Sequence, residues 1–300
     1  MSQQTDLLNK TLIVIAGPTA VGKTAAAIAV AQHYQTEIIS ADSRQFYKEM
    51  SIGTAKPSGS ELAAVKHHFI DSHSIAESFS VGDFERAGLK VLNNIFSHHD
   101  VAVLVGGSGL FIKAICEGFD DLPQADPSIR NQLNEELQQT GIEYLQQQLA
   151  DVDPEYYGQV DIQNPQRLIR ALEVYRSTGR PFSSFRLDQR RHRPFKVVKL
   201  GLNLPRPQLY VRINERVEQM IVHGLVEEVR SLLPYRNLNA LNTVGYSELF
   251  EYFDGKISLA DAIEKIKQNT RRFAKRQLTW FNRDAEITWY KPDELPQEVI

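Results

Sequence analysis

Residues Leu12 to Thr24 read LIVIAGPTAVGKT, which is an apolar run, a glycine-containing turn and a Lys-Thr pair that opens a helical stretch. The pattern G-x-x-x-x-G-K-[ST] in this context predicts a loop whose backbone N–H groups surround phosphate oxygens. The helix N-terminus adds partial positive charge, Lys23 adds a cation, and the Thr24 hydroxyl can ligate Mg²⁺, the metal that we expect. The predicted phosphate-binding residues are Gly17, Pro18, Thr19, Ala20, Val21, Gly22, Lys23 and Thr24.

Apolar runs alternate with helical patterns on both sides of this loop. Strands are expected at TLIVIA (11–16), EIISAD (37–42), HHFID (67–71), VAVLVGG (101–107), KVVKLGLNL (196–204) and EITWY (286–290). Helices are expected at TAAAIAVAQHY (24–34) and SVGDFERAGLKVLNNIFSHH (80–99). This alternation predicts an α/β fold, a P-loop NTPase-like core in which helices flank a parallel sheet.

The composition changes in the middle of the chain. Residues 123–194 are rich in Gln, Asp, Arg and Tyr and contain no convincing strand. Asp126-Pro127 and Asn164-Pro165 each place a capping side chain before a proline, a combination typical of helix starts. We therefore expect an all-helical insertion at 123–194 within a catalytic core made of 1–122 and 195–300.

The composition also limits the class of protein. Of the 300 residues 42% are hydrophobic and 24% charged, with no apolar run long enough to cross a bilayer and no secretory signal apparent at the N-terminus. The single cysteine, Cys116, excludes an internal disulfide and fits a reducing cytoplasm. A net charge of −3 argues against nonspecific coating of nucleic acid, so any RNA-binding residues must be clustered.

The loop alone leaves open which bond is broken. Many P-loop NTPases end a strand with an acidic Mg²⁺ ligand, but VAVLV is followed by Gly106-Gly107-Ser108-Gly109. Ser108 then offers a hydroxyl at the carboxyl edge of the sheet, or the glycines simply form a tight turn. Asp42 follows the second strand and is a candidate general base, an indirect magnesium partner or a helix cap. Its neighbours Ser43 and Gln45 could read a heterocycle through hydrogen bonds.

Basic residues form three groups. Arg212 and Arg216 are spaced i, i+4 and either bind diphosphate or pair with Glu215 or Glu218. A second group comprises Arg130, Arg167, Arg170 and the run Arg186–Arg193, for which a solvated surface is the alternative. In the helix around 269–283, Arg272, Arg276, Thr279 and Arg283 form a stripe without acids, opposite Ala274, Leu278 and Phe281. That arrangement favours a helix that packs on one side and meets a polyanion on the other, over a merely charged surface helix.

Eight segments, in order along nearly the whole chain, resemble the tRNA dimethylallyltransferase (tRNA isopentenyltransferase) family of bacterial type. They are GPTAVGKT, ADSRQFYKEMSIGTAKP, HHFID, GGSGLF, QRLIRALEVYRSTGRP, LYVRINERVEQMIVHGLVEEV, TVGYSEL and TRRFAKRQLTWF. The resemblance implies transfer of a dimethylallyl group from its diphosphate to the exocyclic amine of the adenine 3′ of the anticodon. The C–O bond would break, and a strand without the usual acid is consistent with that, since no γ-phosphoryl group moves.

The resemblance also assigns roles. Asp42 would take the amine proton and Ser108, where the family usually has threonine, would hydrogen-bond the bridging oxygen; Phe111 stands where tyrosine is common. It implies tRNA contacts, through the anticodon stem-loop, by Asp42, Ser43, Arg44, Gln45, Ser108, Arg130, Gln166, Arg167, Leu168, Ile169, Arg170, Asn242, Thr243, Val244, Gly245, Tyr246, Ser247, Arg272, Lys275 and Arg276. It implies diphosphate contacts by Arg212 and Arg216, Mg²⁺ bound through Thr24 and diphosphate, and a monomer.

Three other functions remain open from the residues alone. A small-molecule kinase would use ATP in the same loop and give no role to the basic helices. An isopentenyltransferase acting on a free adenine nucleotide would have little use for the helical insertion. An RNA-binding protein with a nucleotide-gated switch would couple RNA affinity to ATP binding.

Overall fold

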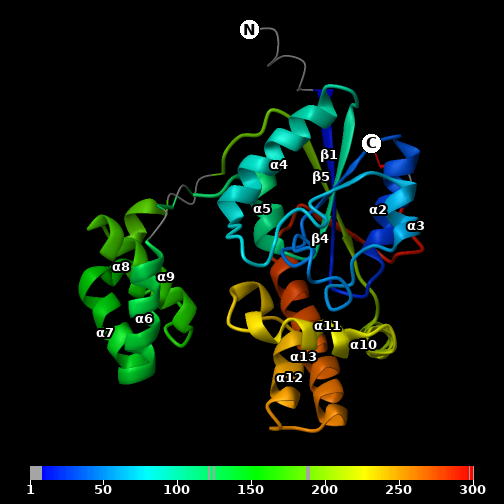
Figure 1. The fold of residues 1–300 in the computed structure, drawn as a ribbon. Helices are drawn as coiled ribbons and strands as arrows, with labels where there is room; N and C mark the ends of the chain where they lie inside the picture. The colour runs from blue at the N-terminus through cyan, green and yellow to red at the C-terminus, as the bar shows by residue number, and fades with distance from the viewer. Residues whose placement is uncertain (1–8, 121, 124–125, 187–189, 297, 300) are drawn as a thin grey trace. The chain divides into compact units, whose positions relative to one another are not determined.

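The computed structural model describes residues 9–120, 122–123, 126–186, 190–296 and 298–299. Its centre is a six-stranded sheet in the order β3-β2-β4-β1-β5-β6, with every pairing parallel (Figure 1). The strands are β1 (Thr11–Ala16), β2 (Ile38–Ser40), β3 (His67–His68), β4 (Val101–Gly106), β5 (Lys196–Leu202) and β6 (Ile287–Tyr290). The predicted α/β class is confirmed. Parallel pairing brings the carboxyl ends of all strands to one edge of the sheet.

Both faces of the sheet are covered by apolar helix surfaces, as a parallel sheet requires. On one face Ile13, Ile15 and Val103 pack against α2 (Lys23–His33), α10 (Arg206–Val222) and α13 (Leu259–Phe281). On the other face Leu12, Val14 and Leu104 pack against α4 (Val81–Phe96) and α5 (Gly109–Glu117). Alternate residues of β1 thus serve different cores, which explains why its sequence is apolar throughout.

One predicted strand is much shorter than expected. HHFID was expected to be extended over 67–71, but β3 contains only His67 and His68. Phe69 and Asp71 have φ values of 63° and 52°, which lie in the left-handed region and end the extended conformation. The chain turns there instead of continuing along the sheet.

A third apolar cluster lies beyond the carboxyl edge of the sheet. It joins parts of α10 and α13 to α11 (Leu225–Ser231) and α12 (Tyr246–Phe253), which Figure 1 shows below the strands. The short 3-10 turns Leu233–Tyr235 and Asn239–Leu241 connect α11 to α12. Helix α3 (Gly59–Ala64) begins at Ser58 with a reciprocal capping box to Glu61.

The chain divides into two compact units, one of 1–117 with 192–300 and the other of 118–191. The predicted boundaries, at 122/123 and 194/195, lie a few residues further along the chain. Within the described residues the second unit is helical: α6 (Pro127–Thr140), α7 (Ile142–Val152), α8 (Pro154–Tyr157), α9 (Pro165–Thr178) and the 3-10 turn Phe182–Phe185.

Helices α6 and α9 of this second unit begin as the sequence predicted, with a capping residue followed by a proline. The Asp126 side chain accepts from Ser128 N, and the Asn164 side chain accepts from Arg167 N. Leucines such as Leu133, Leu145 and Leu168 form a separate buried core there. Across the described parts of the chain, no helix combines the length and the apolar character needed to cross a bilayer.

Candidate active site

The phosphate loop connects β1 to α2 at the carboxyl edge of the sheet. Gly17 and Gly22 have φ values of 145° and 110°, which a residue with a side chain would adopt only with strain. Gly22 precedes the first turn of α2 without any side-chain cap, so the first N–H groups of the helix keep their hydrogen-bonding capacity. The Lys23 ammonium donates to the Pro18 carbonyl at 2.7 Å. The loop therefore has the donors and helix position that phosphate binding needs.

Burial and two neighbouring charges shift the pKa of Lys23. Desolvation is the larger effect and lowers the pKa of Lys23 to about 8, although the nearby Asp42 carboxylate raises it. The Arg216 guanidinium lowers it further. An anion bound in the loop would supply the missing counter-charge, so Lys23 is prepared for an anionic ligand.

A cavity of about 300 Å³ lies beside this loop. Its walls include Lys23, Thr24, Asp42 and Arg216. A threonine hydroxyl together with diphosphate oxygens and waters is the oxygen-rich set that Mg²⁺ prefers, so the residues fit the expected ion.

A second acidic group does not offer a metal site. Glu117, Asp284 and Glu286 present their carboxylates to one point, but the Lys199 ammonium occupies it at 2.7 to 2.9 Å from all three. Although its burial alone would lower it, hydrogen bonds to these acids raise the pKa of Lys199 above its ordinary value. This cluster is an internal ion-pair network.

Asp42 and Ser108 line a larger neighbouring cavity of about 750 Å³. Asp42 Oδ1 accepts a hydrogen bond from Arg44 N at 3.0 Å, which fixes the turn after β2. Ser108 Oγ accepts from Ser43 N at 3.1 Å and donates to Ser43 Oγ at 3.2 Å. The ends of β2 and β4 are thereby tied together, and a carboxylate and a hydroxyl face one cavity next to the phosphate loop.

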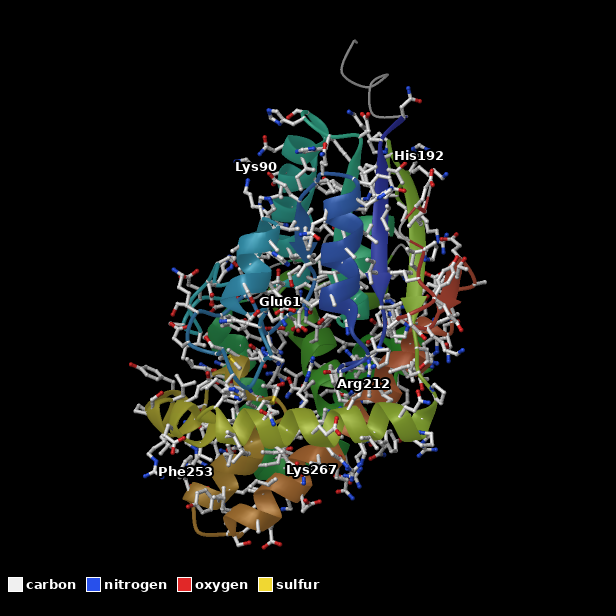
Figure 2. The ribbon with its side chains drawn as sticks, turned by 90° about the vertical axis from the view of Figure 1, so that its right-hand side faces the viewer. Glu61, Lys90, His192, Arg212, Phe253 and Lys267 are labelled. Carbon is white, nitrogen blue, oxygen red and sulfur yellow. The ribbon has the colours of Figure 1, made fainter. Side chains whose placement is uncertain are left out.

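Arg212 and Arg216 both reach the phosphate loop. Arg212 Nη1 donates to the Val21 carbonyl at 3.2 Å, and Arg216 Nη1 lies 3.4 Å from Thr19 Oγ1. Figure 2 shows Arg212 where α10 passes below the carboxyl ends of the strands. The alternative partner Glu218 pairs with Lys267 at 3.0 Å. The helix thus directs two guanidinium groups at the loop.

Gln277 is a site residue that the sequence reasoning missed. It is buried in α13, where its Oε1 accepts from Thr19 N at 2.8 Å and its Nε2 donates to the Gly107 carbonyl at 2.9 Å. A Cβ added to Gly107 would lie 2.2 Å from Gln277 Nε2, so only glycine allows this approach. One amide therefore joins the phosphate loop to the turn after β4. The signal available in the sequence was a polar residue on the apolar face between Ala274 and Phe281.

Helix α13 has the two faces that the sequence predicted. Ala274 and Phe281 are buried and Leu278 is half-buried, whereas Arg272, Lys275, Arg276 and Thr279 are exposed. Arg283, the last member of the predicted stripe, is also exposed but lies beyond the end of the helix at Phe281. Two aromatic side chains that the sequence reasoning did not single out, Phe273 and Trp280, are about two-fifths exposed, at 38% and 42%, and line the larger cavity with Arg276. Flat aromatic faces beside a cationic side chain are suited to stacking an unpaired base.

Asn242–Ser247 was predicted to be a loop, but only 242–245 is one, because Tyr246 and Ser247 begin α12. The loop and Ser247 form another wall of the same cavity. Arg44 holds it from the end of β2, since its guanidinium donates to the Asn239 and Asn242 carbonyls at 3.1 and 3.4 Å. Tyr246 is fully buried, so its side chain packs inside the protein and is no direct contact for a ligand. Asn242 is exposed and Thr243, Val244 and Ser247 are half-buried, which leaves them accessible.

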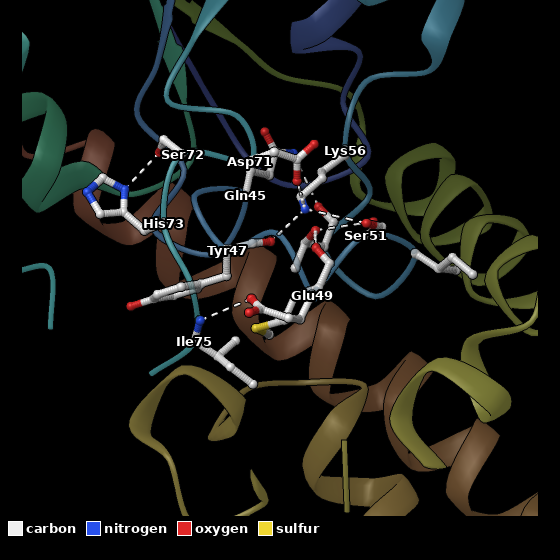
Figure 3. A network of polar contacts seen from close by, with 12 residues as sticks. Gln45, Tyr47, Glu49, Ser51, Lys56, Asp71, Ser72, His73 and Ile75 are labelled. Carbon is white, nitrogen blue, oxygen red and sulfur yellow. Dashed lines mark hydrogen bonds and ion pairs between the residues drawn. The ribbon is translucent and has the colours of Figure 1, made fainter. Parts of the chain in front are cut away.

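The loop after β2 is fixed by its own side chains (Figure 3). Gln45 Nε2 donates to the Thr54 and Ala55 carbonyls at 3.2 and 3.1 Å, so its amide is used internally rather than presented to a heterocycle. The Lys56 ammonium donates to the Tyr47 carbonyl at 2.6 Å and pairs with Asp71. These contacts give residues 45–57 a defined path along the cavities.

Phe111 packs inward, with its ring centroid 5.2 Å from that of Phe84 and 5.6 Å from that of Phe46, and it is also part of the wall of the larger cavity.

Cys116 is buried and unreactive, since burial raises the pKa of its thiol to about 12.

The helical unit presents only part of the predicted contact set. Gln166 and Arg167 are exposed, whereas Leu168 and Ile169 are fully buried in its core. The two buried side chains hold α9 in place and cannot themselves reach a ligand. Arg170 and Arg130 lie 3.0 and 3.9 Å from the Glu173 carboxylate, and Arg170 also donates to the Pro123 carbonyl.

The basic run Arg186–Arg193 is not one surface. Residues 187–189 lie outside the described part of the chain. Arg193 belongs to the core unit, where its side chain is only 10% exposed and donates to Glu85 and to the Ala114 carbonyl, both at 2.6 Å. Its role is to join α4 and α5, because an arginine with these partners has no free face for a polyanion.

A phosphate loop at the carboxyl edge of a parallel sheet, beside a carboxylate and a hydroxyl, defines a P-loop-containing α/β enzyme. The family whose description is "IPP transferase" matches residues 45–284. The chain belongs to this family of prenyltransferases.

Named relatives are similar over nearly their whole length. The chain is 58% identical over 289 residues to a tRNA dimethylallyltransferase of Christiangramia forsetii, covering 96% of both chains. It is 50% identical to a tRNA dimethylallyltransferase of Cytophaga hutchinsonii, covering 97% of this chain and 95% of the relative.

Solved structures show the same fold. A tRNA isopentenylpyrophosphate transferase of Bacillus halodurans is 38% identical with a TM-score of 0.69, over 94% of this chain and 90% of that one. A eukaryotic dimethylallyltransferase acting on tRNA is 26% identical with a TM-score of 0.79, over 94% of this chain and 74% of that one.

Proposed function

We propose that this protein transfers a dimethylallyl group from dimethylallyl diphosphate to the exocyclic N6 amine of the adenine 3′ of the anticodon in tRNA. The observation that carries the proposal is that two cavities share wall residues: the phosphate loop lines the smaller one, and Asp42 belongs to the walls of both. A diphosphate and an adenine could therefore approach the same carboxylate from two sides. The relatives named for tRNA prenylation support this reading.

The proposed reaction is a substitution at carbon. The N6 lone pair attacks C1 of the dimethylallyl group, the C1–O bond breaks, and its electrons leave with the diphosphate. Asp42 accepts the proton that N6 releases, since the amine lone pair is conjugated with the ring and a positioned base raises its nucleophilicity. Ser108 turns its hydroxyl proton from Ser43 Oγ to the oxygen that bridges carbon and phosphorus. Asp42 and Ser108 line the same cavity.

Charge that builds on the leaving diphosphate needs fixed positive partners. The loop from Gly17 to Thr24 supplies N–H donors, and Lys23, Arg212 and Arg216 supply cations around it. Mg²⁺, held by the Thr24 hydroxyl together with diphosphate oxygens, would neutralise part of the same charge.

RNA recognition is proposed for exposed groups of both units. An adenine that reacts at N6 has to leave its stack, and the aromatic faces of Phe273 and Trp280 beside Arg276 would receive it or its neighbours. The anticodon loop of the tRNA would also be contacted by Asn242, Thr243 and Ser247, and the phosphates of that loop by Arg272 and Lys275. In the helical unit Gln166, Arg167, Arg170 and Arg130 are proposed to contact the anticodon stem-loop.

We also propose that the enzyme acts as a monomer in the cytoplasm. A single buried cysteine is compatible with a reducing compartment.

The test is to incubate the protein with Mg²⁺, unmodified tRNA and dimethylallyl diphosphate, with parallel reactions that contain adenosine monophosphate or ATP. One portion of the RNA is digested to nucleosides and weighed, and another is cut with a base-specific ribonuclease so that the heavier fragment can be located. An adenosine heavier by one dimethylallyl group, located next to the anticodon and accompanied by free diphosphate, is the expected result. Free adenosine monophosphate as the preferred acceptor would support the isopentenyltransferase of nucleotides instead. Consumption of ATP without a mass shift in RNA would support a kinase and contradict the proposal.

A further inference from the structure

The Glu228 carboxylate accepts four hydrogen bonds from groups beside the larger cavity, although Glu228 does not belong to the cavity wall. Its Oε2 accepts hydrogen bonds from Ser51 N at 3.0 Å and Ile52 N at 2.7 Å. Its Oε1 accepts from Gly53 N at 3.0 Å and from the Tyr246 hydroxyl at 2.6 Å. One side chain of α11 thus binds three consecutive backbone N–H groups and a buried phenol.

The groups that Glu228 holds belong to two walls of the cavity. Gly53, Thr54 and Ala55 line it on one side, and Asn242 to Gly245, next to Tyr246, line it on another. The two walls are about 190 residues apart in the sequence and are joined behind the cavity by this carboxylate.

Gly53 and the Tyr246 ring pack so closely that there is no space for a side chain at position 53. A Cβ at Gly53 would lie 2.5 Å from Tyr246 Cε2 and 2.7 Å from the hydroxyl oxygen. Burial and the neighbouring Glu228 raise the pKa of Tyr246 above its ordinary value, which keeps the phenol protonated as the donor. In this arrangement the Tyr246 hydroxyl and the N–H groups of the 51–53 turn all donate to the Glu228 carboxylate.

We propose that Glu228 is a positioning residue for the acceptor base: it sets the width of the adenine cavity by fixing the 51–53 turn and, through Tyr246, the 242–245 loop. The proposal rests on the proposed function, since it assumes that adenine enters this cavity. Glu228 touches no reacting atom. It acts through the backbone of two loops that do face the base.

The diphosphate side should depend on Glu228 much less. Residues 54–57 line the smaller cavity. Although Ala55 N and Lys56 N donate to carbonyls of the 51–53 turn, Gln45 and the Lys56 ammonium add hydrogen bonds to this segment that do not pass through Glu228. Loss of the Glu228 contacts should therefore disturb acceptance of the base while leaving binding of the diphosphate intact. A purely structural role would weaken both.

The decisive variant is Glu228→Gln, which keeps size but presents an amide donor to groups that already donate. We expect the single-turnover rate of transfer to tRNA to fall by about 10- to 100-fold, as a small misplacement of a bound substrate commonly does. The dissociation constant for dimethylallyl diphosphate should stay within about twofold of the unaltered protein. Tyr246→Phe, which removes only the hydroxyl, should shift the same quantities in the same pattern by a smaller factor.

The matched control is Glu227→Gln on the neighbouring, exposed position of α11, which should transfer at the unaltered rate. Circular dichroism and thermal unfolding report whether each variant is folded. If Glu228→Gln does not fold, Tyr246→Phe carries the test alone.

The outcomes separate the two proposals. A folded Glu228→Gln protein with unaltered transfer, or one whose diphosphate affinity falls as much as its rate, overturns the positioning role. If the unaltered protein itself fails to prenylate tRNA, the proposed function fails instead, whatever the variants do.

Discussion

The arginines at the sheet edge of the core unit and those of the helical unit differ in their burial and in their hydrogen-bond partners. At the sheet edge Arg44, Arg212 and Arg216 donate to carbonyls or hydroxyls of the loops that form the site. Burial is the main cause that lowers the pKa of Arg44 and of Arg216, which shows how far these two groups are withdrawn from water.

In the helical unit the guanidinium groups are exposed or neutralised locally. Arg167 is exposed, and Arg176 forms two hydrogen bonds of 2.7 Å with Glu136. The difference teaches that an arginine at the sheet edge is part of the geometry of the site, whereas a helical-unit arginine contributes charge or stabilises its own unit. Substitutions at the sheet edge should change rates, and those in the helical unit should change RNA affinity and its dependence on salt.

The largest expected effect on the core side is that of Asp42→Asn. The amide keeps the shape and can still accept from Arg44 N, but it cannot take the proton from the adenine amine. The single-turnover rate should fall by about 10²- to 10⁴-fold, the usual contribution of a general base. Quench-flow measurement with saturating tRNA gives the rate, and a filter-binding titration should give an unaltered affinity for tRNA. A rate within a few-fold of the unaltered protein would remove Asp42 from the role of base.

Gln277→Met should produce the next largest effect. Methionine matches glutamine in length but leaves Thr19 N and the Gly107 carbonyl without their partner. Each buried polar group left unpaired costs about 1–3 kcal/mol, so both the free energy of unfolding and the affinity for diphosphate should fall.

The matched control is Gln268→Met, on an exposed position of the same helix. Urea unfolding and a titration with dimethylallyl diphosphate measure the two quantities. Equal behaviour of the two variants would mean that the Gln277 amide does not hold the phosphate loop.

The contrast between these residues shows what the sequence could predict. The position of Asp42 after β2, the loop Gly17–Thr24 and the existence of the strands were predictable, because buried parallel strands read as continuous apolar runs and the phosphate loop is a local pattern. The early end of β3 at His68 was not predicted. The helix starts at Pro127 and Pro165 were predictable for the same reason, since a cap and a proline act within one turn.

Contacts between distant segments were not predictable. The partners of Gln277 are 170 and 258 residues away, and those of Glu228 on the 51–53 turn are more than 170 residues away. No local pattern records which backbone donor such a side chain will meet. For the same reason the sequence motifs did not predict that Tyr246, Leu168 and Ile169 are buried, because a motif gives the order of residues along the chain and not their exposure to solvent.

Lys23 connects the core site to pH. Because desolvation lowers the pKa of Lys23 to about 8 in the free protein, the ammonium loses its proton as pH rises through that value. A bound diphosphate favours the charged form and raises this pKa, so the complex retains a proton that the free protein has lost. The affinity for dimethylallyl diphosphate should therefore be constant below pH 8 and fall above it, by up to about tenfold per pH unit.

Isothermal titration without tRNA across pH 7 to 10 measures this effect, and proton uptake on binding should appear in buffers of different ionisation enthalpy. Lys23→Arg is the control, since a guanidinium stays charged throughout this range. Its affinity should lack the decline, whatever its absolute value. A decline of the same size in both proteins would assign the titration to another group.

The smallest effect is expected in the helical unit, from Arg167→Ala. This side chain is exposed, so its removal should not disturb the core of the unit that Leu168 and Ile169 form. If it neutralises one tRNA phosphate, the slope of log affinity against log salt concentration should become shallower by about 0.7 to 0.9. The rate at saturating tRNA should stay unaltered, in contrast to Asp42→Asn.

The control is Arg86→Ala, which removes an exposed arginine of α4 that pairs with Asp83 and should leave the slope unchanged. A rate loss at saturating tRNA for Arg167→Ala would break the division between the two units, because a helical-unit arginine would then shape the reaction itself.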